Sequence, residues 1–184
     1  MCRTAGRAKA RRRLAWDCLA WAVLHVAASY LPRLLPDTVF RLGSWPWAIR
    51  DFESGGRRYD ALWIRSWQHR LPDGRRLLGG GAPPAPTSDP DRLADLAART
   101  CRNELAHWLA IAGAPGFALF NPPGATVAIH VYALATNLPC IAVQRYNRAR
   151  LVRALSRARG RPHPSPVMNP VYQASGGGTP ASTP

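Results

Sequence analysis

Three polar side chains stand at the start of an apolar stretch in TCRNELAHWLAIAGAPGFALF, residues 100–120. Arg102, Glu104 and His107 serve no purpose in a helix that only fills a core or crosses a bilayer. Glu104 and His107 are three residues apart, so on a helix they share one face, whereas Arg102 points away from Glu104. A carboxylate beside an imidazole raises the basicity of the ring and fixes its tautomer, as a general base requires. A hydrogen bond that only caps the entry of a membrane helix fits the spacing as well, so both interpretations stay open.

A second pair of histidine and carboxylate occurs in WQHRLPDG, residues 67–74, where three residues separate His69 from Asp73. Many membrane glycerolipid acyltransferases pair histidine with aspartate across four intervening residues, so this pair is one residue short. The sequence Pro72-Asp73-Gly74 is also typical of an ordinary turn. We favour the turn and keep the catalytic interpretation as the alternative.

Other catalytic and metal-binding patterns are missing from the sequence. A di-iron bundle needs two Glu-x-x-His motifs and two further glutamates, and the chain has only Glu53 and Glu104. It has no G-x-S-x-G elbow, phosphate-binding loop or Rossmann glycine pattern. Its four cysteines show neither zinc-binding nor disulfide-rich spacing. We therefore expect no metal and no cofactor.

Two apolar stretches are long enough to cross a membrane. Residues 14–31 follow a basic run and would reach about 27 Å as a helix, close to the hydrocarbon thickness of a bilayer. No small-residue cleavage site follows them, which argues against a signal peptide. Residues 124–143 carry no formal charge and make the best span in the chain. Residues 105–120 are apolar too, but two glycines and a proline between 113 and 116 predict a bent or re-entrant segment.

The remaining segments differ in composition. Residues 32–104 interleave tryptophan with arginine, which favours the headgroup zone of a membrane. A helix is expected to start at Ser88 or Asp89, with Pro90 in its first turn. Further along, QRYNRARLVRALSRARGR indicates a cationic amphipathic helix over residues 144–161.

The pattern as a whole predicts an all-α fold. We expect one small integral membrane domain, residues 1–161, with two or three apolar helices and an interfacial, Trp/Arg-rich middle region. Residues 162–184 are too rich in proline, glycine and serine to bury a core, so we expect a disordered C-terminal tail.

Charge is concentrated at the ends of the chain. The formal net charge of +15 comes from 25 Lys+Arg against 10 Asp+Glu, with six basic residues in residues 3–13 and seven in 145–161. Basic clusters beside apolar stretches predict binding to anionic membrane lipids. Nucleic acid would attract the same charges, but no nucleic-acid-binding signature accompanies them, so we expect none as a partner.

Two membrane topologies fit these spans. If residues 14–31 and 124–143 both cross, both basic ends lie in the cytoplasm, as the positive-inside rule prefers. If residues 105–143 instead form a hairpin, one basic end lies outside unless residues 14–31 only dip into the membrane. We favour the first arrangement.

Three blocks together resemble a known family. RSWQHRLPDG at 65–74, TCRNELAHW at 100–108 and NLPCIAVQRYNRARL at 137–151 are similar to blocks of the glycosyl-4,4'-diaponeurosporenoate acyltransferase family, membrane enzymes of bacterial carotenoid biosynthesis. The blocks come in the same order at similar spacing. The resemblance implies transfer of a fatty acyl group from an activated thioester to a sugar hydroxyl of a glycosylated carotenoid or similar glycolipid.

The resemblance and the residues together give the expected site. His107 is the expected base and Glu104 orients it, with His69 and Asp73 as the second candidate catalytic pair. The expected substrate-binding residues are Arg102, Trp108, Gln144, Arg145, Asn147 and Arg148. The three arginines are suited to donor phosphates or the developing oxyanion, and also to lipid phosphate.

The expected partners are an acyl thioester donor, a glycolipid acceptor and membrane lipids. The expected location is the bacterial cell membrane, with the protein integral to it. A noncatalytic membrane anchor or adaptor with basic termini is the alternative function. Substitution of His107 would separate the two.

Overall fold

The structure, a computed structural model, describes residues 2–71 and 85–160 of the 184-residue chain. Asp73 and the predicted tail lie outside the described residues. The frame consists of the α-helices α1 (Cys2–Leu34), α4 (Pro90–Gly113) and α5 (Pro123–Arg159), and of the 3-10 helix η4 (Ala114–Leu119). The described ranges contain no β-strand, and the all-α fold class is confirmed.

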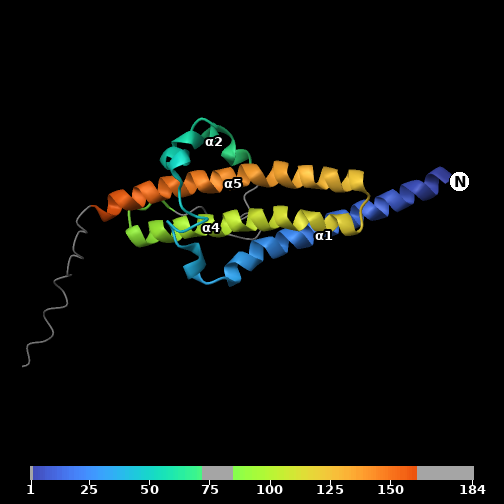
Figure 1. Cartoon of the computed structure of the whole chain (residues 1–184), viewed down its shortest axis with the longest axis horizontal. Helices are drawn as coiled ribbons and strands as arrows, with labels where there is room; N and C mark the ends of the chain where they lie inside the picture. The colour runs from blue at the N-terminus through green and yellow to red at the C-terminus, as the bar shows by residue number, and fades with distance from the viewer. Residues whose placement is uncertain (1, 72–84, 161–184) are drawn as a thin grey trace, which may run out of the picture.

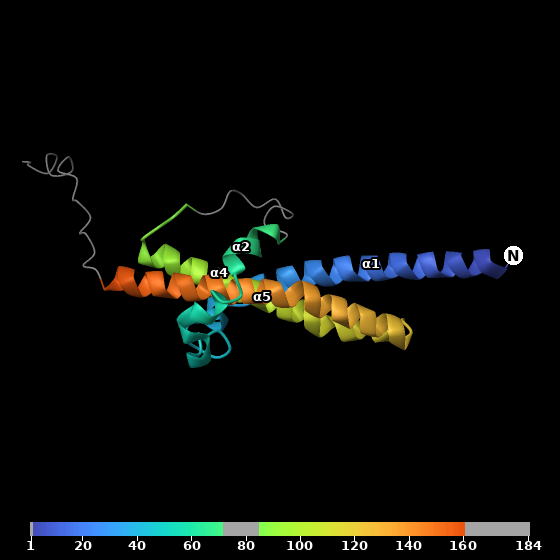
Figure 2. The ribbon, with the colours of Figure 1, turned by 90° about the horizontal axis from the view of Figure 1, so that it is seen from above.

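α4 and α5 form an antiparallel hairpin in which η4 and a short turn join the two helices (Figure 1). α1 packs along α4 in the opposite direction. Near the hairpin turn, Asn121 Nδ2 donates a hydrogen bond to Asp17 Oδ1 at 2.7 Å. Just beyond the C-terminal end of α1, Asp37 forms an ion pair with Arg102 of α4. α1 therefore runs parallel to α5, and the N-terminus lies at the turn end of the hairpin (Figure 2).

This parallel arrangement corrects the favoured topology. Two helices that cross a bilayer in the same direction leave their basic ends on opposite sides, not on one side. The sequence could not reveal this, because the direction of α1 is set by contacts between residues far apart in the chain, such as Asp17 with Asn121. α4 and α5 do pack as an antiparallel hairpin, while the placement of residues 105–143 in a bilayer as a hairpin stays a prediction.

Local sequence explains where α4 begins and ends. Asp89 is the N-cap residue, and its Oδ1 accepts a hydrogen bond from the backbone N–H of Asp91 at 3.1 Å. Pro90 follows in the first turn, where a backbone N–H has no helical partner. The predicted helix start is confirmed. At the other end, a Cβ on Gly113 would lie 2.4 Å from Leu24 Cδ1, so glycine allows α1 to approach closely there.

α5 is one continuous helix of 37 residues with Pro139 inside it. The predicted span and the predicted amphipathic helix, residues 124–143 and 144–161, are therefore parts of a single element. A proline removes one backbone hydrogen bond from a helix interior, but it does not end the helix here.

The middle region folds into short helices that pack on the hairpin: η1 (Asp37–Phe40), η2 (Asp51–Tyr59), α2 (Ile64–Trp67) and η3 (Gln68–Arg70). Two small apolar cores hold them in place. One joins Phe40 and Trp47 to Cys101 of α4, and the other joins Ile64 to Val143 and Tyr146 of α5. These cores fix the middle region beside the polar part of the hairpin.

η2 packs tightly against α5 at Gly56. Its φ is +92°, a conformation that L side chains rarely adopt, and a Cβ there would lie 2.5 Å from Ala149 Cβ. Glycine therefore meets two requirements at once, a left-handed backbone and backbone contact with α5.

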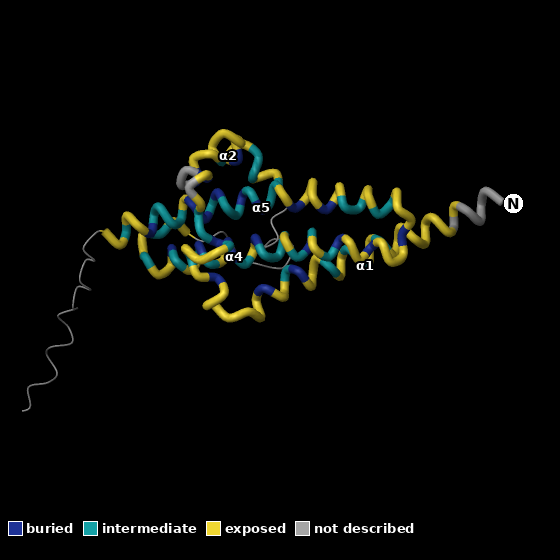
Figure 3. The backbone as a smooth tube through the Cα atoms, viewed as in Figure 1, coloured by how far each residue is buried: buried dark blue, intermediate teal, exposed yellow. Residues whose placement is uncertain are grey.

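Large apolar side chains remain exposed on α1 and on the first half of α5, whereas buried residues gather where the middle region packs (Figure 3). Within the part of the chain that the structure describes, two helices are long and apolar enough to cross a membrane, Lys9–Leu34 and Pro123–Arg159. The exposed large apolar residues on these helices include Leu14, Trp16, Leu19, Val23, Val26, Val127, Val131, Leu134 and Leu138.

Candidate active site

Glu104 lies on α4 with 1% of its surface exposed, and both oxygens of its carboxylate accept hydrogen bonds. Arg145 Nη1 donates to Oε1 at 2.9 Å and Arg148 Nη2 donates to Oε2 at 2.5 Å. The indole N–H of Trp108 also donates to Oε1, at 3.3 Å. A buried carboxylate is tolerated because two cations compensate its charge.

Glu53 of η2, also 1% exposed, is the second acid of this cluster. Arg145 donates to it twice, from Nε to Oε1 at 2.8 Å and from Nη2 to Oε2 at 3.1 Å. The hydroxyl of Tyr59 donates to Oε1, and the backbone N–H of Arg50 donates to Oε2 at 2.6 Å. Arg145 therefore links η2 to α4, and Glu53, Arg145, Glu104 and Arg148 form one buried charge network.

The network shifts the pKa values of its η2 members. Burial disfavours the charged form of Glu53, but hydrogen bonds from Arg145, Tyr59 and the Arg50 backbone outweigh burial and lower its pKa to about 2. Burial and the hydrogen bond to Glu53 raise the pKa of Tyr59 to about 12. Glu53 is therefore a permanent anion and Tyr59 a neutral donor at neutral pH, and neither is suited to proton transfer.

Arg148 is fully buried, at 0% exposure. Its Nη1 donates to Cys101 Sγ at 3.5 Å, and its Nε has no hydrogen-bond partner in the described part of the chain. Burial raises the pKa of Cys101, and the opposing effect of Arg148 does not overcome it. The thiol therefore stays protonated and is not an activated nucleophile.

His107 lies one helical turn beyond Glu104 but takes a different partner. Its Nδ1 is 2.9 Å from Asn137 Oδ1 on α5. The amide N–H groups of Asn137 are directed to the carbonyl of Ala133 at 2.9 Å and to Thr136 Oγ1 at 3.2 Å. The amide oxygen therefore faces the ring, so Nδ1 carries the proton and Nε2 has the free lone pair.

This geometry corrects one expectation about the pair. The structure describes Glu104 and His107 and gives no hydrogen bond between them; Asn137 fixes the tautomer instead. The i, i+3 spacing predicted a shared face, but Arg145 and Arg148 occupy both oxygens of Glu104. The chain has many arginines and two glutamates. This excess of arginine was the feature of the sequence that indicated competition between arginines and His107 for the carboxylate of Glu104.

The expected substrate-binding arginines form ion pairs within the protein. Arg102 pairs with Asp37, and its guanidinium lies 4.7 Å from the centroid of the Phe40 ring. Arg145 and Arg148 bind the two glutamates as described above. Some of their donors therefore already have protein acceptors, and the binding of donor phosphates by these arginines stays a prediction.

Three other predicted substrate-binding residues make few or no side-chain hydrogen bonds within the described residues. Trp108 is 45% exposed despite its weak bond to Glu104. Gln144 and Asn147 are partly buried on α5 and make no side-chain hydrogen bond within the described residues. These three side chains keep groups available for a ligand beside the network.

His69 is exposed in η3, and the structure does not bring it to the other predicted residues. The preceding α2 packs on α5 through Ile64 and Trp67, in the core that contains Val143 and Tyr146. No hydrogen bond links His69 to Glu104 or His107, all of which the structure describes. Whether His69 pairs with Asp73 falls outside the described residues.

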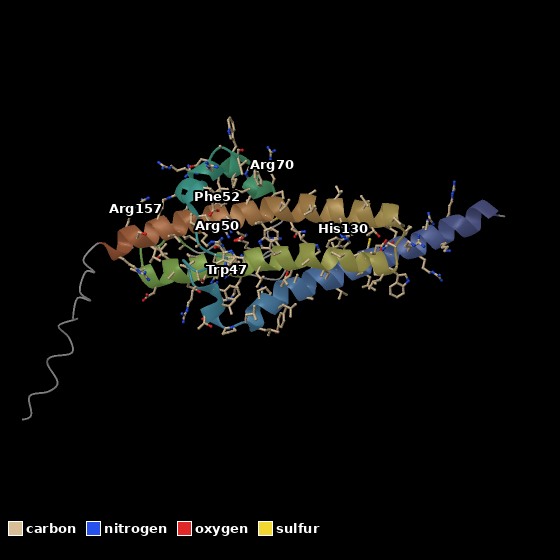
Figure 4. All side chains as sticks on the ribbon, in the orientation of Figure 1. Trp47, Arg50, Phe52, Arg70, His130 and Arg157 are labelled. Carbon is tan, nitrogen blue, oxygen red and sulfur yellow. The ribbon has the colours of Figure 1, made fainter. Side chains whose placement is uncertain are left out.

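Figure 4 shows labelled side chains along the hairpin. Trp47 and Arg50 lie beside α4 and α5, while His130 lies toward the hairpin turn and Arg157 toward the end of α5. Within residues 2–71 and 85–160, no group of three His, Cys, Asp or Glu side chains is placed to hold a metal ion. The features available for chemistry are a histidine with a free ring nitrogen and a buried charge network one turn away.

Fold and site define a helical protein with two candidate membrane spans and a polar centre at one end of them. The family model described as glycosyl-4,4'-diaponeurosporenoate acyltransferase matches residues 38–157. The chain therefore belongs to this acyltransferase family.

Curated relatives agree with the family match. Proteins named glycosyl-4,4'-diaponeurosporenoate acyltransferase from Staphylococcus aureus strains bovine RF122 / ET3-1, MRSA252 and USA300 are each 30% identical over 139 residues. The match covers 73% of this chain and 83% of each relative. No solved structure matches the chain.

Proposed function

We propose that this acyltransferase moves a fatty acyl group from an activated thioester to a sugar hydroxyl of a glycosylated carotenoid or similar glycolipid. The names of its relatives describe a glycosylated carotenoid acid as the acceptor. The observation that carries the proposal is the orientation of His107, whose Nδ1 is held by Asn137 so that Nε2 is free to accept a proton.

The reaction requires one base. The sugar hydroxyl oxygen attacks the thioester carbonyl carbon while Nε2 of His107 takes the hydroxyl proton. The resulting tetrahedral intermediate expels the thiolate, and the imidazolium returns the proton to it as the thiol. One ester bond forms, one thioester bond breaks, and the histidine ends neutral. Trp108, whose indole N–H is only weakly bonded to Glu104, is suited to donate to an oxygen of the substrate.

Glu104 has a positioning role in this proposal. Its carboxylate holds Arg145 and Arg148 of α5 against α4. His107 lies on α4 and Asn137 on α5, so the helix pair that the network fixes is the pair that orients the base. The network thus sets geometry and makes no proton transfer.

We further propose that the protein is integral to the bacterial cell membrane. The exposed apolar side chains of α1 and α5 extend from the hairpin turn to the level of the site. An amphiphilic glycolipid presents its sugar at the membrane boundary and its apolar chain to the bilayer. A base next to the polar end of the apolar helices is in reach of that sugar.

The test compares two histidines of the same chain. His107→Ala should lower acyl transfer by about 10²–10⁴-fold, the usual contribution of a general base. His130→Ala is the matched control, because His130 bonds only within α5, to the carbonyl of Thr126 at 2.7 Å. Membranes carrying each variant are supplied with an acyl thioester and a glycosylated carotenoid, and the ester product is measured by mass spectrometry.

Asn137→Ala tests the orientation of the ring separately. It should lower kcat more than it changes KM, since it frees the tautomer and leaves the substrate-facing nitrogen in place. Equal amounts of variant protein in the membrane and unchanged melting temperatures in detergent show that the variants fold. Full transfer by folded His107→Ala protein would refute the catalytic role and favour the noncatalytic anchor.

A further inference from the structure

Two arginines from distant parts of the chain converge on one buried tyrosine. Arg65 Nε of α2 donates a hydrogen bond to Tyr146 Oη at 2.7 Å. The guanidinium of Arg150 lies 5.6 Å from the centroid of the same ring. Tyr146 is 1% exposed, while both arginines are exposed. The tyrosine is therefore a fixed platform that holds two cations at the surface.

Neither cation forms an ion pair with another described residue. In the described residues, Arg65 and Arg150 form no ion pair, although Asp60 lies near enough to favour the charge of Arg65. The bond to Tyr146 uses only Nε of Arg65, so its two Nη groups keep their donors. Both guanidiniums carry a positive charge beside the same tyrosine ring, and an anion that contacts both would be attracted by each of them.

The platform is rigid. Tyr146 packs with Ile64 of α2 and Val143 of α5 in one apolar core, so α2 cannot move away from α5 without opening that core. Arg65 is tied by its hydrogen bond and Arg150 by the ring. A site organised before the ligand arrives loses little conformational entropy on binding.

The position of the pair matches the phosphate level of a bilayer. The apolar sequence of α5 ends at Val143, and Tyr146 follows it by about 4.5 Å along the helix axis. The arginines first expected to bind phosphate, Arg102, Arg145 and Arg148, are engaged by Asp37, Glu53 and Glu104.

We infer that Arg65 and Arg150, held on Tyr146, bind a phosphate group. A guanidinium presents paired N–H donors that match phosphate oxygens, and two of them can hold one phosphate from two sides. The same chemistry would hold the headgroup of an anionic lipid or a soluble phosphate such as that of a coenzyme. The inference does not depend on acyl transfer, so its test can fail while the proposed function stands.

The test uses the purified full chain in neutral detergent. The probes are dioctanoyl phosphatidylglycerol, coenzyme A and inorganic phosphate, with dioctanoylglycerol as the uncharged control. Phosphate-bearing probes should raise the melting temperature of the wild type, and the apparent affinity should fall at least about ten-fold in the Arg65→Gln/Arg150→Gln variant. Arg92→Gln/Arg99→Gln removes the same charge from the exposed start of α4 and should bind like the wild type.

The pattern among probes identifies the source of the phosphate. Stabilisation by phosphatidylglycerol alone assigns the site to a lipid headgroup, and stabilisation by coenzyme A or inorganic phosphate assigns it to a soluble ligand. Arg150→Gln alone loses no hydrogen bond, so it reports on binding even if the double variant folds poorly. A wild type that no phosphate probe stabilises, or equal losses in the two double variants, would overturn the inference.

Discussion

Arg145 binds Glu53 with both Nε and Nη2, although 92 residues separate them in the chain. The remaining nitrogen, Nη1, donates to Glu104. One side chain of α5 therefore connects the 3-10 helix η2 to the α4–α5 hairpin. The middle region is therefore joined to the hairpin by this cation as well as by its small apolar cores.

Replacing Glu53 should show how much stability the network supplies. Glu53→Gln leaves Arg145 buried with one partner fewer, and breaking a buried ion pair from one side costs about 3–5 kcal/mol. Unfolding in detergent, followed by helix content against denaturant, measures the change. Asp95→Asn is the control, because Asp95 pairs with Arg99 on the exposed face of α4, and its loss should cost less than about 1 kcal/mol. Equal costs for the two variants would contradict a structural role for the network.

Stability should fall in acid for the same reason. The pKa of Glu53 is about 2 in the folded protein against an ordinary value of 4.5. The unfolded chain therefore takes up a proton first as pH falls, and protonation favours unfolding. The contribution of Glu53 is complete above its ordinary pKa and is lost progressively as pH approaches the folded value. The free energy of unfolding measured across this range should decline less steeply in Glu53→Gln than in the wild type.

Alanine substitutions at two glycines can distinguish the cost of backbone strain from the cost of a steric clash. Gly43 and Gly56 have φ values of +93° and +92°, but a Cβ meets nothing within 4 Å at Gly43 and meets Ala149 Cβ at 2.5 Å at Gly56. Gly43→Ala should cost about 1–2 kcal/mol of strain. Gly56→Ala should cost about 1–3 kcal/mol more, because η2 must move away from α5. Melting temperatures of the two variants test this, and similar losses would mean that the close approach is unimportant.

The parallel direction of α1 and α5 predicts opposite locations for the two termini. Reporters that are active on only one side of the membrane, fused to the N-terminus or the C-terminus, should give opposite results. A cysteine placed at the exposed Gly124, beside the hairpin turn, should react with an impermeant reagent from the N-terminal side. Both termini reporting from one side would show that α1 and α5 do not both cross.

Short-range features were readable from the sequence. The apolar spans follow from local composition, and the start of α4 follows from Asp89 and Pro90, whose capping involves only neighbouring backbone groups. The family blocks likewise placed His107 and Glu104 on one helix. Each of these inferences depends on residues within a few positions of one another.

The partners of the charged side chains were decided by tertiary structure. Helical spacing put Glu104 and His107 on one face, but Arg145 and Arg148 from α5 took the carboxylate and Asn137 took the ring. Glu53 entered the site from η2, and α1 settled parallel to α5. Composition and periodicity fix what each segment can bury, whereas the pairing of groups far apart in the chain depends on how the buried helices pack, because every buried charge must find its counter-charge there.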